Sequence, residues 1–202
     1  MFADREDAGR VLAKLLVHYD ASPDAVVLGI PRGGVVVAAQ VARSLHLPLG
    51  VVVTAKIASP DNPEYAVGAL APDGVITSDR HVLGGEAELQ SLSGPARAKI
   101  ERSLAAFSSP ELGRFATAIV VDDGLATGLT ALAAVRYLRR AGMRHVVLAV
   151  PVAAAHSEQM LEPEVDRLVV AETPHFFSAV GQFYDRFGQT SDAEVKRLLS
   201  EG

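Results

Sequence analysis

Apolar and polar positions follow two different periods along most of this chain. Short continuous apolar runs are typical of strands that are buried on both faces of a sheet. Such runs occupy residues 25–30, 49–55, 119–121, 146–150 and 168–171. Between several of them, apolar residues recur every three or four positions, as they do on one face of a helix, at residues 8–19, 37–45 and 132–138. The alternation predicts an α/β fold, a three-layer sandwich with a central, mainly parallel sheet.

A less regular stretch separates the first two predicted strands from the third. Residues 56–63 form a polar loop in this interpretation, and the runs at 65–70 and 75–78 form a hairpin around Ala71-Pro72-Asp73-Gly74. Residues 83–113 are interpreted as an insertion, either a lid over a site or a contact with a second copy, with a helix at 95–107. Ser191 and Glu194 have the spacing of a capping box for a final helix.

Composition and charge exclude several kinds of partner and chemistry. The 202 residues are enough for a single domain, 1–202, with a substantial core. A net charge of −5 gives no reason to expect nucleic acid as a partner. The absence of cysteine excludes disulfides and thiolate chemistry, and no apolar run approaches the ~20 residues that span a bilayer. We therefore expect a cytoplasmic protein that does not bind membranes.

The most informative segment runs from Ala118 to Thr130 and reads AIVVDDGLATGLT. An apolar strand leads into two adjacent carboxylates, Asp122 and Asp123, and then into a short loop with two glycines before a helix begins. A helix N-terminus presents unpaired N–H groups that attract anions, and carboxylates can accept hydrogen bonds from sugar hydroxyls. A phosphate site next to a polyol site would suit a ribose 5-phosphate. The plainer alternative is that Thr127 caps the helix and that the aspartates are solvated.

These residues resemble the motif that binds 5-phosphoribosyl 1-pyrophosphate (PRPP) in type I phosphoribosyltransferases. The resemblance implies that Asp122 and Asp123 hold the ribose hydroxyls. The loop that would wrap the 5-phosphate consists of Gly124, Leu125, Ala126, Thr127, Gly128, Leu129 and Thr130. The segment is neither a Walker loop nor a G-x-G-x-x-G dinucleotide motif.

Two further segments match the positions at which this family binds pyrophosphate. The loop after the first strand contains Pro31, Arg32, Gly33 and Gly34, and the family often has a cis peptide there, although the sequence does not say at which bond. Lys56 follows the second predicted strand. With Asp122 and Asp123, Arg32 and Lys56 complete the catalytic set that the resemblance implies. The alternatives are a plain turn with a solvated arginine and an exposed lysine at a strand end.

The resemblance also predicts a small hood over the site, at residues 172–190. Phe176, Phe177 and Tyr184 lie there and could stack on a flat acceptor, or they could simply pack this segment onto the sheet. Residues 62–69, which include Glu64, resemble a stretch of one uncharacterised subgroup of the family.

The reaction that the resemblance implies is Mg²⁺-dependent transfer of the phosphoribosyl group from PRPP to a nitrogen heterocycle, as in nucleotide metabolism, by a homodimer. The metal would be held through the substrate near Asp122 and Asp123. Purine-type members carry an aspartate where this chain has Ala126, so the usual 6-oxopurine chemistry is disfavoured and the acceptor stays open. A PRPP or nucleotide sensor and a ribose-phosphate phosphohydrolase are the alternative functions.

Overall fold

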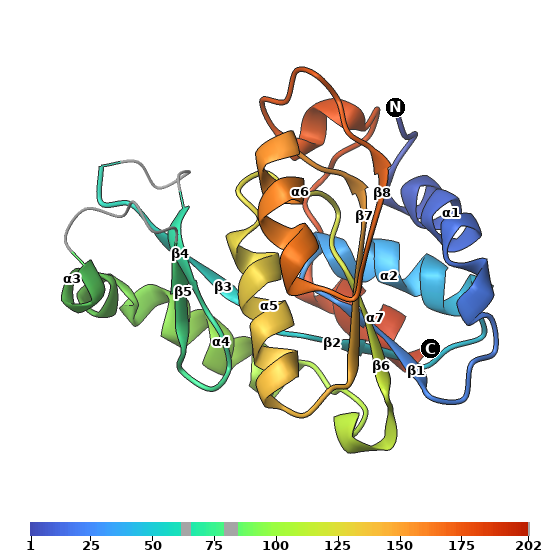
Figure 1. The fold of residues 1–202 in the computed structure, drawn as a ribbon, viewed down its shortest axis with the longest axis horizontal. Coiled ribbons are helices and arrows are strands. Elements are labelled where there is room, and N and C mark those ends of the chain that lie inside the picture. Colours follow the sequence, from blue (N-terminus) through green and yellow to red (C-terminus); the bar gives the residue numbers. More distant parts are fainter. Residues whose placement is uncertain (62–65, 79–84, 202) are drawn as a thin grey trace.

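The computed structural model describes residues 1–61, 66–78 and 85–201 and has a five-stranded parallel sheet. This sheet lies at the centre of the molecule (Figure 1). The strands lie in the order β2-β1-β6-β7-β8. Their bounds are β1 Ala25–Gly29, β2 Leu49–Val51, β6 Thr117–Val121, β7 His145–Val152 and β8 Arg167–Glu172. Each neighbouring pair is parallel, which confirms the predicted central sheet.

Helices cover both faces of this sheet and make it the middle layer of three (Figure 1). On one face lie α1 (Arg5–Leu15), α2 (Gly33–Ser44) and α7 (Asp192–Ser200), and on the other lie α5 (Leu129–Arg140) and α6 (Ala155–Leu161). Successive strand side chains point to opposite faces, so Val27 packs in the first layer while Val26 and Leu28 pack in the second. Burial on both faces explains why the strands are continuous apolar runs.

A second sheet of three antiparallel strands projects from the main body (Figure 1). It comprises β3 (Ala55–Ala58), β4 (Ala66–Leu70) and β5 (Ile76–Ser78), and it is followed by α3 (Gly85–Leu92) and α4 (Gly94–Ala106). The hairpin and the helix near 95–107 were predicted correctly, whereas α3 was missed.

The predicted single strand over 49–55 is wrong. β2 ends at Val51, and Ala55 already begins β3 in the other sheet. The apolar run is unbroken because the linking residues Val52 and Val53 are also buried, so hydrophobicity alone could not mark the break. Thr54 lies within this link and donates a hydrogen bond to the Thr130 carbonyl at 3.2 Å. The predicted polar loop 56–63 likewise begins as strand β3, and residues 62–65, including Glu64, lie outside the described residues.

Other differences from the predicted elements are small. The first helix ends at Leu15, which is 42% exposed, and a 3₁₀ turn, η1 (Val17–Tyr19), follows it. Further 3₁₀ turns are η2 (Leu112–Arg114), η3 (Glu162–Glu164) and η4 (Val180–Phe183). The N-cap half of the predicted capping box is present, because the Ser191 hydroxyl accepts a hydrogen bond from the Glu194 N–H at 3.2 Å.

The beginning of the chain pairs with a segment near its end. The Phe2 N–H donates to the Phe183 carbonyl at 2.8 Å, and the Asp185 N–H donates back to the Phe2 carbonyl at 2.9 Å. The Phe2 ring lies 5.6 Å from the Tyr184 ring, centroid to centroid. These contacts fix the start of α1 next to the C-terminal segment.

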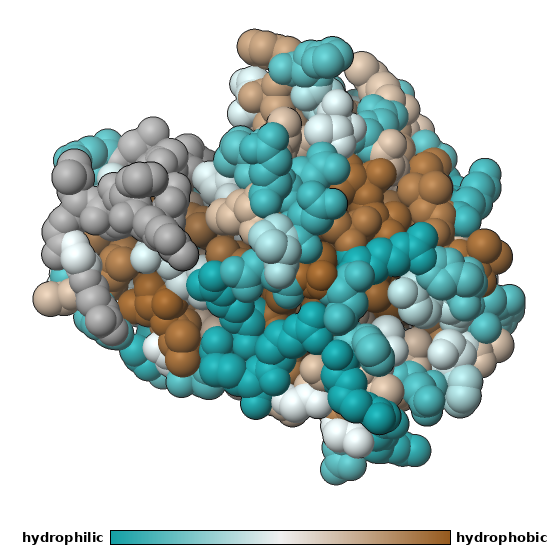
Figure 2. All heavy atoms as spheres, in the orientation of Figure 1, coloured by the Kyte–Doolittle hydropathy of each residue, from teal (hydrophilic) through white to brown (hydrophobic). Residues whose placement is uncertain are grey.

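Hydrophobic and hydrophilic residues are interspersed on the face of the molecule shown in Figure 2. Among the residues that the structure describes, no helix combines the length and the apolar character needed to cross a membrane.

The close packing of α1 on α2 gives a test of the fold. A Cβ atom added at Gly9 would lie 2.6 Å from both the Val37 carbonyl oxygen and the Gln40 Cβ, neither of which can swing away. Gly9→Ala should therefore lower the free energy of unfolding by about 1–3 kcal/mol, despite the better helix propensity of alanine. Chemical denaturation measures the change. The matched control is Gly94→Ala in α4, where a Cβ meets no atom within 4 Å, and equal stability of the two variants would contradict the packing.

Candidate active site

The loop 31–34 (the glycine loop) and the acidic pair Asp122-Asp123 lie side by side because they follow the adjacent strands β1 and β6. β1 and β6 pair in parallel up to Gly29 and Val121, and the Ile30 N–H then donates to the Val121 carbonyl at 2.9 Å. The loop 31–34 and the pair Asp122-Asp123 therefore leave the same edge of the sheet, where open α/β folds bind ligands. The Pro31–Arg32 peptide bond is cis.

The two glycines of this loop leave the space that the carboxylates fill. A Cβ on Gly33 would lie 2.0 Å from Asp123 Oδ2. A Cβ on Gly34 would lie 2.7 Å from the Val121 carbonyl oxygen and 2.9 Å from Asp122 Oδ1. Neither site can hold a side chain without moving the acidic pair, so the glycine loop and the carboxylates form one unit.

Two adjacent carboxylates in a partly buried place repel each other, and the structure shows how the repulsion is relieved. Burial, and then the charge of Asp123, raise the pKa of Asp122 well above its usual range. The Asp123 N–H donates to Asp122 Oδ1 at 2.9 Å. Arg5 Nε donates to Asp123 Oδ2 at 2.7 Å and supplies a compensating charge. Arg5 was not predicted from the sequence, since nothing links an arginine in the first helix to a motif more than a hundred residues later.

The predicted phosphate loop is fixed on its outer side by β7 and α6. The Leu125 N–H donates to the Val152 carbonyl at 2.9 Å, and the Ala154 N–H donates to the Leu125 carbonyl at the same distance. The hydroxyl of Ser157, which is fully buried, donates to the Ala126 carbonyl at 2.5 Å. These hydrogen bonds use the carbonyl groups of Leu125 and Ala126 and the N–H of Leu125.

Helix α5 then begins without a side-chain cap. Its N-cap residue is Gly128, which has a left-handed φ of 72°. Thr127 is not the cap, contrary to the plainer alternative considered from the sequence. The first N–H groups of a helix have no partner within the helix, so this helix start presents donors where the motif predicts a phosphate.

Three cationic side chains, Arg32, Lys56 and Lys99, lie close enough to influence one another and the acidic pair. Arg32 is half-exposed, with its Nη1 3.4 Å from Asp192 Oδ1. Lys56 is in β3 of the second sheet and not at the end of a central strand. Lys99, on α4, joins them: partial burial and the charges of Arg32 and Lys56 lower its pKa, while Asp122 acts in the opposite direction. The sequence prediction missed Lys99, which is an exposed residue of α4 next to buried Ile100.

A cavity of about 550 Å³ lies beside the phosphate loop. Its walls come from the loop, the start of α6, strand β4 and the predicted hood. The lining residues are Ala66, Ala126, Thr127, Leu129, Ala154, Ala155, His156, Met160, Pro174, His175, Phe177 and Ser178. These described walls carry imidazoles, hydroxyls and one aromatic ring but no acidic or amine side chain.

The three aromatic residues predicted to contact an acceptor have different environments. Phe177 lines the cavity, and its ring lies 5.2 Å from the Phe183 ring. Phe176 is 78% exposed. Tyr184 is buried between the rings of Phe2 and Phe187, so it packs the segment onto the fold.

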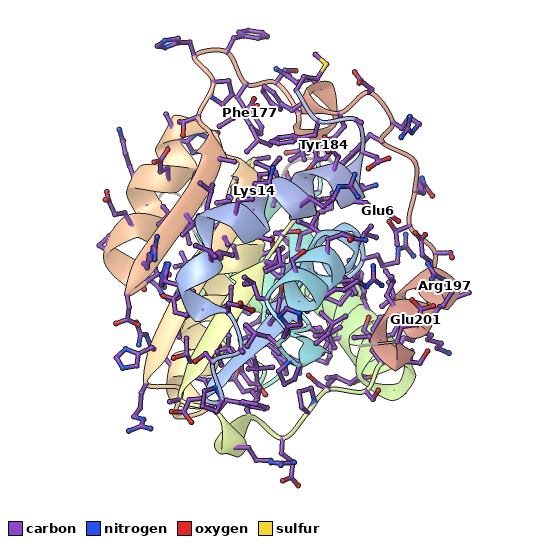
Figure 3. All side chains as sticks on the ribbon, turned by 90° about the vertical axis from the view of Figure 1, so that its right-hand side faces the viewer. Glu6, Lys14, Phe177, Tyr184, Arg197 and Glu201 are labelled. Carbon is purple, nitrogen blue, oxygen red and sulfur yellow. The ribbon has the colours of Figure 1, made fainter. Side chains whose placement is uncertain are left out.

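Tyr184 also acts as a support for the acidic pair. Its hydroxyl donates to the Asp123 carbonyl at 2.6 Å, and burial together with the nearby Asp123 charge raises its pKa, so it stays protonated. Figure 3 shows Tyr184 on the same side of the molecule as the start of α1, where Glu6 is labelled. Asp123 is thus held by a residue from each end of the chain, Arg5 and Tyr184.

Comparison with solved structures identifies relatives of this fold. The protein TT1426 from Thermus thermophilus is 35% identical, with a TM-score of 0.78 over 100% of this chain and 98% of that one. A hypothetical protein from Neisseria gonorrhoeae, crystallised with ppGpp, is 19% identical with a TM-score of 0.50 over 100% of this chain and 96% of that one, a likeness of fold alone.

Sequence comparison is more specific. Two curated proteins from strains of Mycobacterium tuberculosis, each named "Putative phosphoribosyl transferase", are 41% identical to this chain over 208 residues. The match covers 98% of this chain, which spans about half (46%) of the length of each relative. The family model described as "Phosphoribosyl transferase domain" matches residues 4–185, which include the glycine loop, the acidic pair, the phosphate loop and most of the hood. The chain therefore belongs to the phosphoribosyl transferase family.

Proposed function

We propose that this protein transfers the 5-phosphoribosyl group of PRPP to a nitrogen heterocycle and releases pyrophosphate. The observation that carries the proposal is the joining of three parts at one edge of the sheet: the glycine loop, the acidic pair and the uncapped start of α5. PRPP has three matching parts, which are pyrophosphate, ribose hydroxyls and a 5-phosphate. Cationic side chains lie near the proposed position of the pyrophosphate, and the cavity lies beside the phosphate loop.

In this proposal the chain acts by positioning and by charge. The helix start and Thr127 hold the 5-phosphate, while the carboxylates of Asp122 and Asp123 accept hydrogen bonds from the ribose hydroxyls. As the bond from C1 to the pyrophosphate oxygen breaks, positive charge develops on the ribose and the leaving group becomes more negative. The carboxylates stabilise the positive charge on the ribose, and Arg32, Lys56 and Lys99 stabilise the negative charge on the leaving pyrophosphate.

Mg²⁺ fits the donor chemistry of this site. Carboxylate oxygens are suitable ligands, and the ion usually keeps waters and binds substrate phosphates as well. Asp122 and Asp123 would hold it, directly or through water, together with the sugar and the pyrophosphate. When bound, it would neutralise charge on the leaving group.

The acceptor is proposed to occupy the 550 Å³ cavity. Ala126 and Ala154 leave room for a flat ring, which Phe177 could contact from the hood. Because Ala126 offers no carboxylate, polar recognition would come from His156, His175 and the neighbouring hydroxyls. This chemistry differs from that of purine-type relatives, which have an aspartate at the position of Ala126.

The first test is calorimetric titration of PRPP, with and without Mg²⁺. We expect binding that strengthens with Mg²⁺ and that Asp123→Asn weakens by about tenfold or more, since the variant removes a charged hydrogen-bond acceptor but keeps the shape. Asp20→Asn is the control, because Asp20 is exposed and pairs with His46 at the other end of β1. Absence of PRPP binding at millimolar concentration would refute the proposed function.

The second test concerns the cationic side. Lys99→Gln should weaken pyrophosphate binding by about tenfold, as measured by calorimetry, while Lys196→Gln on the exposed side of α7 should leave it unchanged. Since the pKa of Lys99 is lowered, its charge is present at neutral pH and is lost at a lower alkaline pH than for an ordinary lysine. Pyrophosphate binding should thus decline early in the alkaline range for the native protein, and Lys99→Gln should remove that decline. An identical pH profile in both proteins would exclude Lys99 from the site.

The third test separates the acceptor cavity from the PRPP site. A set of pyrimidine, purine and azole bases is assayed for release of pyrophosphate from PRPP. Phe177→Ala should raise the acceptor KM several-fold, by loss of ~1 kcal/mol of ring contact, and should leave PRPP affinity unchanged. Phe176→Ala is the matched control because that ring is 78% exposed. Equal effects of the two variants would argue against the cavity as the acceptor site.

A further inference from the structure

The first helix contributes a cation to the acidic pair, from a segment outside every motif recognised in the sequence. Arg5 is the first residue of α1, and its side chain is 12% exposed. Its Nε donates to Asp123 Oδ2 at 2.7 Å. That oxygen is also the atom nearest to the Cβ position of Gly33, at 2.0 Å, so Arg5 acts on the carboxylate at the point where it meets the glycine loop.

The remaining parts of the Arg5 guanidinium are also held. Nη1 donates to the Gly188 carbonyl at 2.7 Å, and the guanidinium carbon lies 3.8 Å from the centroid of the Phe187 ring. An arginine is suited to this place because its planar group can donate in two directions and stack on a ring at the same time. Arg5 therefore has one preferred orientation, and through it Asp123 has one as well.

Arg5 brings its positive charge into direct contact with Asp123, whose backbone carbonyl is held from the C-terminal segment by the Tyr184 hydroxyl. Of these two contacts, the one from Arg5 reaches the carboxylate itself.

We propose that Arg5 is a positioning residue for PRPP, one that holds the Asp123 carboxylate in the orientation that meets the ribose hydroxyls. The N-terminal helix is then part of the substrate site and not only a cover for the sheet. This role rests on the proposed function, because it concerns the ribose end of the same site.

The test measures PRPP affinity by calorimetry in the native protein, Arg5→Gln and Arg5→Lys. Arg5→Gln should weaken binding by about tenfold, the size expected for loss of one charged hydrogen bond.

Arg5→Lys should recover part of the affinity. A lysine keeps the positive charge but cannot bond Asp123 and Gly188 while stacking on Phe187. Arg10→Gln is the matched control, since Arg10 is on the same helix and half-exposed, and pairs with Glu6 and Asp7. We expect native PRPP affinity in this control, and thermal unfolding shows whether each variant is folded.

The outcomes separate this inference from the function on which it rests. If the native protein binds PRPP and folded Arg5→Gln binds it equally well, the role of Arg5 is overturned while the function stands. A loss of affinity in Arg5→Gln that Arg5→Lys does not recover in part would also overturn it, because a purely structural defect gives that pattern. If Arg5→Gln does not fold, the affinity of folded Arg5→Lys decides: PRPP binding that is weaker than native supports the role, and native affinity contradicts it. If the native protein does not bind PRPP, the proposed function itself is refuted.

Discussion

The site depends on the close contact between the acidic pair and the backbone of two glycines. Gly33 and Gly34 leave room for Asp123 and Asp122, and no other residue type fits at those two positions without displacing a carboxylate. The contact exists because β1 and β6 are parallel neighbours whose ends lie at the same level of the sheet. The position of the loop relative to the pair is therefore set by the register of two central strands and not by flexible side chains.

Much of the fold follows from local patterns in the sequence. Buried parallel strands have continuous apolar runs, and helices that cover them repeat every three or four residues, so the central sheet and its helices were predictable. The break between β2 and β3 was not, because Val52 and Val53 remain buried between the two sheets. Helix α3 was also missed, as Gly85–Leu92 carries only a weak apolar face.

The residues of the site are of two kinds: some belong to short motifs, and others reach the site only through tertiary packing. The acidic pair and the loops around Arg32 and Thr127 were recognised because each is a short segment with its own chemistry. Arg5 and Lys99 were not recognised, because each reaches the site from a helix distant in sequence, and only tertiary packing brings it there. For Tyr184 the sequence left open stacking on an acceptor or packing onto the fold; it is buried and donates to the Asp123 carbonyl, a contact that composition could not reveal.

The pairing of Phe2 with the segment around Tyr184 has a consequence for biosynthesis. Arg5 and Tyr184 both contact Asp123, yet they are close to opposite ends of this sequence. A ribosome releases the chain from its N-terminus, so strands β1 and β6 can pair long before residues 183–188 have emerged. The acidic pair is therefore supported on both sides only after residues 183–188 have been synthesised. A chain that stops short of it could still form most of the central sheet, but Asp123 would lack the tyrosine that supports it and Arg5 would lack the ring on which it stacks.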